Sequence, residues 1–358
     1  MVLQKLLRIL GVLLSRLRQW HLFKGIVKLD IKKLAKLLVR KKWDVAGELL
    51  SQFSRPLRVS FREADLATSA HGIQWVISTS DSCEFIFSKS MPQHEFQPCI
   101  TRLILLMPML KAFHCSKYFQ SGSLFINLGD WADTNGLALC SNRDDSTLIP
   151  GIDFLSTNGY RETRLDFMVN SPPWNMRKPI AFWRGNTTGV RVGDSWRSLP
   201  RVQLCELANQ TNSQPFFDVG ITSFAQLSKR EAREIRAAGY VRSFAPITSC
   251  SRFKYQIDID GNSNAWSALF QKLLSGSVVL KVASPGNFRQ WYYDQLIPWK
   301  NFVPVRSDMS DLVEKIQWLL THDDEAREIG INGAKLAYQL TYEQELDRAL
   351  VNINKALT

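Results

Sequence analysis

A polar segment directly after an apolar stretch is the first place where this sequence could do chemistry. Residues 184–189, with the sequence RGNTTG, follow the apolar residues 180–183 and combine one cation, two hydroxyl groups and two glycines. Such a strand-to-loop step suits backbone N–H groups to cradle phosphate oxygens. The Lys-Ser/Thr step of a P-loop is missing, and a purely structural turn is the alternative interpretation.

Carboxylates stand at the ends of two further predicted strands. Asp258 and Asp260 form a D-x-D tripeptide before a glycine, which has the form of a metal clamp; turn-forming aspartates are the alternative. Asp130 follows the strand-like residues 123–128. A carboxylate at that place could act as a general base, or its side chain could close an Asx turn.

The elements that must position these residues alternate between strands and helices, which predicts an α/β fold. Ligands of open α/β sheets bind outside the carboxyl ends of the strands, so we expect a site where the strands before Asn186 and Asp260 end. The predicted parts of the chain are a basic helical segment at 1–50, a first α/β domain at 51–175, a second at 176–340, and a C-terminal helix at 341–358 that can pack back on the first domain. The boundary near residue 175 lies in VNSPPWNMRKP, a segment rich in Pro, Asn and basic residues.

Hydrophobic patterns place individual elements in both domains. In the first domain they predict strands and turns at 61–80, a buried helix at 99–113 and a short apolar strand at 121–131. In the second they predict strands at 254–261, 277–282 and 301–305, a helix at 264–276 closed by Gly276, and a helix at 310–322 with Ser310 as N-cap. The last helix is predicted to start at Thr341, with Gln344 at capping-box spacing.

Composition and charge exclude several classes of protein. With 45% hydrophobic and 22% charged residues, the 358-residue chain has the balance of a folded globular protein. The sequence contains no run of about 18 uncharged apolar residues, so no transmembrane helix is predicted. The six cysteines show neither a C-x-x-C pair nor a His at metal-ligand spacing, which argues against a zinc site or a disulfide framework and favours a reducing compartment.

The net charge of +12 comes almost entirely from one end of the chain. Residues 1–42 hold 12 basic residues and one acid, whereas the other 316 residues hold 33 basic and 32 acidic residues. Lys5 and Arg8 interrupt the first apolar run and no small-residue cleavage site follows, so we expect no export. In a helix formed by residues 1–20, the leucines and the basic residues would lie on opposite faces. A second stretch, at 26–40, also combines lysines with Leu, Ile and Val. This pattern favours a helix in the interface of an anionic membrane; a hairpin docked on the body with its lysines in water, and nucleic-acid binding, are the alternatives.

Five segments, in this order, resemble glycosyltransferase family 90. They are NLGD at 127–130, FWRGNTTG at 182–189, KYQIDIDGN at 254–262, LLSGSVVLK at 273–281 and LIPWKNFVPV at 296–305. The family includes eukaryotic protein O-glucosyltransferases, fungal capsule-associated proteins and bacterial lipopolysaccharide glycosyltransferases. The resemblance spans roughly residues 120 to 340, and the basic N-terminus makes the chain most similar to the bacterial branch.

The resemblance implies a GT-B architecture, in which two Rossmann-like domains face each other across a cleft. It also implies inverting transfer from a UDP-sugar without a bound metal, with Asp130 as the base that accepts the proton of the acceptor hydroxyl. Asn186 matches a residue that touches the donor, Arg201 matches an arginine that pairs with the diphosphate, and Arg184 and Gly185 belong to the same strand end. The loop that closes over the nucleotide matches Ser263, Asn264, Ala265, Trp266, Ser267 and Ala268.

The sequence departs from the animal members of the family at one position in this loop. An arginine that they carry aligns with Ala268, so one diphosphate cation is missing or comes from elsewhere. Lys281 is the expected substitute, with a structural snorkelling lysine as the alternative.

Together these observations predict a hexosyltransferase that is peripheral on the inner face of the bacterial inner membrane. Its expected partners are a UDP-hexose, a lipopolysaccharide core or related glycan, and an anionic membrane surface contacted by residues 1–42. Neither a cofactor nor nucleic acid is expected. The alternative is a non-catalytic membrane- or nucleic-acid-binding protein on an α/β scaffold.

Overall fold

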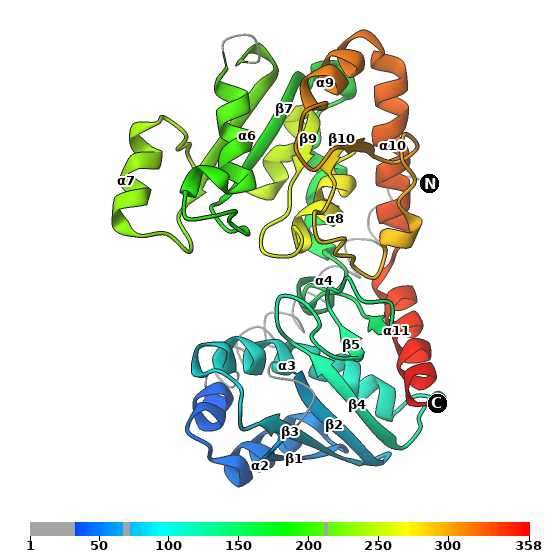
Figure 1. Ribbon diagram of the computed structural model, residues 1–358. Coiled ribbons are helices and arrows are strands. Elements are labelled where there is room, and N and C mark those ends of the chain that lie inside the picture. Colours follow the sequence, from blue (N-terminus) through cyan, green and yellow to red (C-terminus); the bar gives the residue numbers. More distant parts are fainter. Residues whose placement is uncertain (1–32, 67–71, 211–213) are drawn as a thin grey trace, which may run out of the picture. The chain divides into compact units, whose positions relative to one another are not determined.

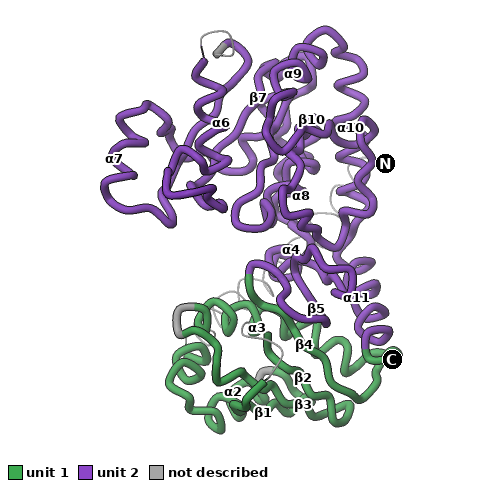
Figure 2. Tube along the Cα trace, viewed as in Figure 1, with its two compact units in different colours: residues 1–129, 357–358 green, residues 130–356 purple. Residues whose placement is uncertain are grey.

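The computed structural model describes residues 33–66, 72–210 and 214–358, and it divides into two compact units (Figures 1 and 2). Unit 1 extends to Gly129 and includes Leu357–Thr358, and unit 2 comprises Asp130–Ala356. This division lies earlier in the chain than the boundary near residue 175 that the sequence predicts. The reason is that α4 (Ile152–Ser156) and α5 (Arg161–Asn170) bury aromatic side chains in a core of unit 2.

Unit 1 contains a mixed sheet. Its elements are α2 (Trp43–Ser54), β1 (Arg58–Ala64), β2 (Gly72–Thr79), β3 (Ser82–Ser88), α3 (Gln93–His114) and β4 (Gly122–Asn127). The strands adjoin in the order β1-β3-β2-β4; β1 and β3 are parallel, and β2 is antiparallel to both of its neighbours. Because two residues join β2 to β3, these strands can only form an antiparallel hairpin. The sheet of this unit therefore differs from the parallel sheet of a Rossmann-like domain.

The long helix α3 packs on this sheet. The rings of Trp75 and Phe113 lie 5.8 Å apart, and those of Phe87 and Phe96 lie 5.3 Å apart. The prediction of a buried helix at 99–113 is confirmed. Within the described part of the chain, α3 is also the one helix long and apolar enough to cross a bilayer, with a mean hydropathy of 1.2 over Glu95–His114, but 56% of that window is buried. Core helices of globular domains share these properties.

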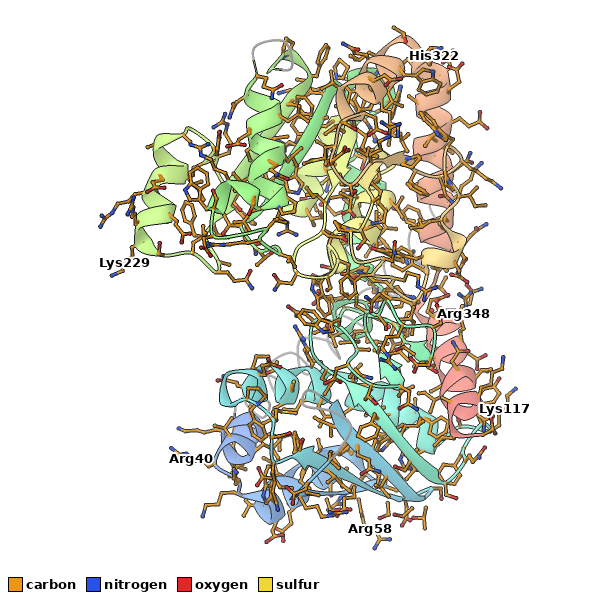
Figure 3. All side chains as sticks on the ribbon, in the orientation of Figure 1. Arg40, Arg58, Lys117, Lys229, His322 and Arg348 are labelled. Atoms are coloured by element: carbon orange, nitrogen blue, oxygen red, sulfur yellow. The ribbon has the colours of Figure 1, made fainter. Side chains whose placement is uncertain are left out.

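The end of the basic N-terminal segment is packed on the protein. Residues 33–39 are helical, and Leu34 and Leu38 are buried. The exposed residues of this stretch are basic: Lys33, Lys36 and Arg40, the last labelled in Figure 3. The leucine face of this stretch therefore contacts protein, as in the docked alternative. Residues 1–32, with the first amphipathic stretch, lie outside the described residues.

Unit 2 is built around a parallel sheet of five strands. The strands are β7 (Lys178–Asn186), β8 (Phe217–Ser223), β9 (Phe253–Asp258), β10 (Val278–Val282) and β11 (Val303–Val305). They adjoin in the order β8-β7-β9-β10-β11, and each adjacent pair is parallel. The helices are α6 (Pro200–Asn209), α7 (Lys229–Ala237), α8 (Ser267–Leu274), α9 (Leu312–Thr321), α10 (Asp323–Gln339) and α11 (Tyr342–Leu357). A short parallel pair, β5 (Gly136–Ala138) and β6 (Ser146–Leu148), precedes α4.

Helices cover both faces of the five-stranded sheet (Figure 1). One core joins Trp183 and Ile257 of the sheet to Val202 of α6 and Ile316 of α9. A second core includes residues of α5, α8, α10 and β10. This doubly wound arrangement confirms the predicted α/β class and the parallel sheet.

Helix ends agree with the sequence only in part. Thr341 Oγ1 accepts a hydrogen bond of 3.3 Å from the backbone N–H of Gln344, as predicted for the last helix. The predicted N-cap Ser310 is wrong: Asp311 occupies the cap position, and the Ser310 hydroxyl donates to Asp308 instead. Asp308 competes successfully because it lies two residues away and its carboxylate accepts strongly.

Candidate functional site

The strand order of unit 2 contains a switch point of the kind at which open α/β sheets bind ligands. Chain order reverses between β7 and β9, which are neighbours in the sheet although β8 lies between them in the sequence. At such a switch point the connections leave in opposite directions, and a crevice opens outside the carboxyl ends of the two strands. Those ends carry Asn186, the last residue of β7, and the residues that follow Asp258 of β9.

Arg201 joins the two strand ends. Its Nη1 donates to Asn186 Oδ1 at 2.6 Å and to Thr188 Oγ1 at 2.8 Å. On the other side, its Nε donates to the Asp260 carbonyl at 3.1 Å and its Nη2 to the Ile259 carbonyl at 3.3 Å. Most of its N–H groups are thus directed at protein acceptors, and the guanidinium fixes the geometry of the crevice.

Local structure explains why Arg201 reaches this place. Pro200 is the first residue of α6, where its missing N–H costs nothing, so Arg201 lies in the first turn of the helix beside the strand ends. Burial lowers the pKa of Arg201 to about 10, while Asp258 and Asp260 act in the opposite direction. The residue remains a cation at neutral pH, and its charge lies at the N-terminus of α6, where anions are favoured.

The turn after β9 has no room for a side chain at Gly261. A Cβ there would lie 2.8 Å from Thr188 Oγ1 and 3.2 Å from Arg201 Nη2. The same Thr188 hydroxyl donates to Asn186 Oδ1 at 2.6 Å. The close approach of the two loops therefore requires glycine at this position.

Asp130 lies beside this turn. Asn262 Nδ2 donates to Asp130 Oδ2 at 3.0 Å, although 132 positions separate the residues in the sequence. Both side chains are half-buried. The fold thus brings the predicted base next to the residues that follow β9, two positions from the Asp260 carbonyl that Arg201 holds.

The predicted nucleotide loop is held by a buried network. Ser263 and Asn264 are buried, whereas Ala265, Trp266, Ser267 and Ala268 are half-buried. Asn264 Oδ1 accepts from the Trp266 N–H at 2.6 Å and from Gln290 Nε2 at 2.7 Å, and Gln290 also donates to the Trp266 carbonyl. Trp266 has a φ of 48° and a ψ of −124°, which is a strained backbone that only such surrounding contacts can hold. α8 therefore begins at Ser267 and not at residue 264 as predicted.

Asp258 belongs to a buried ion cluster. Its Oδ1 lies 2.9 Å from Lys272 Nζ, and its Oδ2 lies 3.7 Å from Lys281 Nζ. Burial alone would raise the pKa of Asp258, but the two ammonium groups outweigh it and hold the pKa below its ordinary value. Both oxygens face ammonium groups, which argues against the metal-clamp interpretation of this aspartate. No group of three His, Cys, Asp or Glu side chains gathers as metal ligands in 33–66, 72–210 and 214–358.

Two predicted donor-binding cations, Arg184 and Lys281, lie in ion pairs. Arg184 Nη2 lies 2.5 Å from Asp218 Oδ1, and its guanidinium covers the Phe182 ring at 4.7 Å. Alternation along β7 places Arg184 with Phe182, on the face opposite Trp183 and the core that includes α6. Lys281 faces Asp258 and lies 4.9 Å from the Tyr293 ring centroid.

Gly185 has a packing role beside Arg184. A Cβ at this position would lie 2.4 Å from the ring of Trp183, so the indole covers the strand where a side chain would stand. The structure thus brings together Asn186, Arg201, Asp130 and the 260–264 turn. Thr188, Asn262 and Gln290 had no individual role in the sequence prediction, because polar residues of these types in turns carry no pattern that distinguishes ligand contacts from turn contacts.

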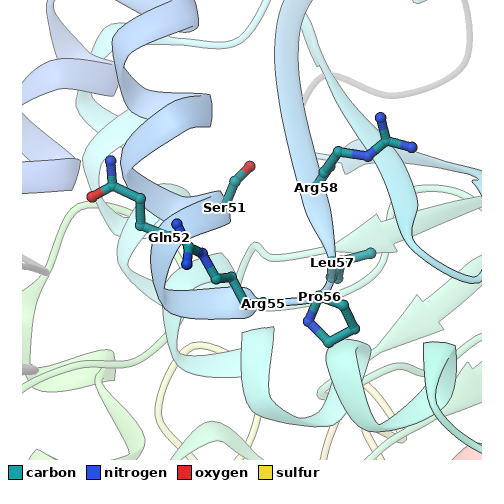
Figure 4. Close-up of a pocket in the computed structure, with 6 residues that line it drawn as sticks. All are labelled: Ser51, Gln52, Arg55, Pro56, Leu57 and Arg58. Atoms are coloured by element: carbon teal, nitrogen blue, oxygen red, sulfur yellow. The ribbon is translucent and has the colours of Figure 1, made fainter.

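The cavities found elsewhere do not involve these residues. One of about 620 Å³ in unit 1 is lined by Ser51, Gln52, Arg55, Pro56, Leu57 and Arg58 (Figure 4). Another of about 410 Å³ in unit 2 lies between the segment after α5 and one side of α10. The second is near the start of β7, away from the carboxyl ends of the strands.

Comparisons with known proteins identify relatives. Residues 160–345 match the model of glycosyl transferase family 90. The chain is 32% identical over 232 residues to "Protein O-glucosyltransferase 2" of Danio rerio, which covers 60% of this chain and 42% of that protein. It is 29% identical over 242 residues to "Protein O-glucosyltransferase 3" of Homo sapiens, which covers 62% of this chain and 44% of that protein. The chain thus spans less than half the length of these two relatives.

Two solved structures resemble part of this chain. The C-terminal domain of the group 1 family glycosyl transferase LpcC from Francisella tularensis has a TM-score of 0.32 and 10% identity, covering 50% of this chain and 92% of that one. TarM has a TM-score of 0.37 and 14% identity, covering 52% of this chain and 37% of that one. Since the family match extends over more than half of the sequence, this chain belongs to glycosyl transferase family 90.

Proposed function

We propose that the chain is an inverting glycosyltransferase that moves a hexose from a UDP-sugar to a hydroxyl group of a lipopolysaccharide core or related glycan. The observation that carries this proposal is the contact between Asn262 and Asp130, which places a carboxylate beside a crevice organised by Arg201. Family membership and the names of the relatives support glycosyl transfer. Protein hydroxyl groups are the competing acceptor class, because the curated relatives are named protein O-glucosyltransferases.

The proposed mechanism uses Asp130 as the base. Its carboxylate takes the proton from the acceptor hydroxyl as the oxygen attacks the anomeric carbon, and the bond to the UDP oxygen breaks on the opposite face. The charge that grows on UDP is met by the N-terminal turn of α6, with Arg201, and by that of α8. These groups are fixed before the reaction, so they stabilise the leaving group without reorganisation.

The exchange of Asp130 for Asn tests this assignment. Asp130→Asn keeps the size of the side chain but removes the base, so we expect sugar transfer to fall at least 100-fold, the lower end of general-base contributions. UDP should still raise the melting temperature as it does in the wild type. Turnover retained in this variant would remove Asp130 from the mechanism.

The donor, the metal independence and the acceptor need separate measurements. Thermal stabilisation by UDP-glucose, UDP-galactose and UDP-N-acetylhexosamines ranks the donors. Release of UDP should be insensitive to EDTA, because Lys272 and Lys281 already neutralise Asp258; EDTA-sensitive release would support a metal site. Transfer to a lipopolysaccharide core and to a folded protein domain, compared at equal concentration, separates the two acceptor classes.

Membrane association remains a proposal for residues 1–32. Leu34 and Leu38 are buried in unit 1, so the leucine face that could enter a bilayer lies in the first amphipathic stretch. We propose that this stretch holds the enzyme on the inner face of the bacterial inner membrane. Sedimentation of the full chain with anionic vesicles, lost when the basic residues Lys5, Arg8 and Arg16 are changed to Gln, tests the proposal. Unchanged sedimentation would count against it.

A further inference from the structure

We propose that Asn262 is a positioning residue for Asp130, whose amide fixes the orientation of the carboxylate relative to the 260–264 turn. This inference rests on the proposed function, because Asn262 acts only through Asp130. The contact is direct, with 3.0 Å between Asn262 Nδ2 and Asp130 Oδ2. An amide side chain neither takes up nor releases a proton near neutral pH, so its contribution is to hold the carboxylate by donating to it.

The backbone around Asn262 is fixed on its N-terminal side. Arg201 binds the carbonyl groups of Ile259 and Asp260. Gly261 is enclosed by Thr188 and Arg201, and its N–H donates to the Asn264 carbonyl at 3.4 Å. The main chain that enters Asn262 therefore has little freedom.

The C-terminal side is held equally well. Ser263 and Asn264 are 1% exposed, and Gln290 donates to Asn264 Oδ1 at 2.7 Å. Asn262 thus projects from a turn anchored at both ends. Because the turn is fixed, the Asn262 amide can hold the Asp130 carboxylate in one orientation. A side chain on a free loop could not do so.

The geometry of Asp130 matters for the proposed reaction. A base must come within about 2.6–3.2 Å of the hydroxyl oxygen whose proton it takes. A displacement on the order of 1 Å can cost about 100-fold in rate. Because Asn262 belongs to the turn that Arg201 holds, the amide also ties the position of the base to that of the donor crevice. Loss of the amide should therefore reduce kcat while donor binding persists.

The test compares three variants of Asn262 in the full chain. For Asn262→Ala we expect kcat for sugar transfer to fall about tenfold, with the donor KM and the stabilisation by UDP unchanged. Asn262→Gln retains an amide donor and should recover part of the loss. Asn262→Asp keeps the size but removes the donor and adds a like charge, so its kcat should lie below that of Asn262→Ala.

A matched control separates the expected loss of kcat from the general effect of losing a hydrogen bond between an Asn and an Asp side chain. Asn170 Nδ2 donates to Asp166 Oδ1 at 2.7 Å on the exposed side of α5. Asn170→Ala removes the same chemical contact and should leave kcat unchanged. Melting temperatures of all variants show whether folding is affected.

The outcomes distinguish this inference from the function on which it rests. If Asp130→Asn is inactive while Asn262→Ala has wild-type kcat, the positioning role is overturned and the function stands. If Asn262→Ala and Asn262→Gln lose activity equally, together with a lower melting temperature, the residue is structural and the inference also fails. Should Asn262→Ala fold poorly, the isosteric Asn262→Asp decides, since wild-type kcat in that variant would contradict the inference.

Discussion

Arg201 Nη1 lies 2.6 Å from Asn186 Oδ1, and this hydrogen bond joins the first turn of α6 to the last residue of β7. Asn186 Oδ1 also accepts from the backbone N–H of Thr188 at 3.0 Å and from its hydroxyl at 2.6 Å. One amide oxygen thus organises the turn after β7 and orients the guanidinium that reaches across to β9.

Replacing Arg201 with Lys should weaken both stability and donor binding. A lysine has one nitrogen and cannot satisfy acceptors on both strand ends, so several hydrogen bonds to a charged group are lost, each worth about 1.5–3 kcal/mol. We expect a lower melting temperature and at least a tenfold higher donor KM. Arg197→Lys, at an exposed arginine paired with Glu206, is the control and should change neither. A wild-type donor KM in Arg201→Lys would contradict the assigned role.

A methyl group at Gly261 should disturb the crevice. The Cβ of Gly261→Ala would lie 2.8 Å from Thr188 Oγ1, and relieving this contact should cost about 1–3 kcal/mol. Gly189→Ala, whose Cβ would lie 3.4 Å from Pro200 Cδ, is a neighbouring control with ordinary contacts. Thr188→Ala should cost less in the Gly261→Ala background than in the wild type, as a double-mutant cycle from urea unfolding can show. Strict additivity would mean that the two residues do not contact each other.

The two lysines beside Asp258 should differ in importance. Lys272 Nζ lies 2.9 Å from Asp258 Oδ1 and 2.8 Å from the Ile257 carbonyl, whereas Lys281 Nζ lies 3.7 Å from Asp258 Oδ2. Lys272→Met should lower the free energy of unfolding by about 3–5 kcal/mol, because it leaves a buried carboxylate without its closest partner. Lys281→Met should cost less and leave UDP binding intact. A large loss of UDP binding in Lys281→Met would restore this lysine as a ligand of the diphosphate.

Asp260 should make stability depend on pH. Burial raises its pKa to about 6, although Lys281 favours the carboxylate. The folded state therefore holds the proton more tightly than the unfolded chain, in which the pKa of an aspartate is about 3.9. This stabilisation is complete below about pH 4, is lost as the pH rises through 6, and amounts to at most roughly 3 kcal/mol.

Comparison of the wild type with Asp260→Asn measures this pH-dependent stabilisation. The variant lacks the titration, so the free energy of unfolding of the wild type minus that of the variant should decrease between pH 4 and pH 7. Asp65→Asn, at an exposed aspartate of unit 1, controls for the loss of a surface charge. A difference that stays constant over this range would show that the pKa of Asp260 does not differ between the folded and unfolded states.

The sequence by itself determined several of the elements and the class of the fold. Alternating apolar strands and amphipathic helices in the second half predicted a parallel sheet, and the strands before Asn186 and Asp260 are β7 and β9. These predictions succeed because strand and helix periodicity arises from neighbouring residues. The segment pattern also led to the family, which the match over residues 160–345 confirms.

Only the tertiary structure decided which polar side chains are directed at one another. Arg184 and Arg201 have the same chemistry in the sequence, yet Arg184 pairs with Asp218 while Arg201 joins β7 to β9. Asn262 meets Asp130 across 132 positions of sequence. Local patterns cannot encode such contacts, since they depend on strand order, on the face to which each residue points, and on which buried charges neutralise one another.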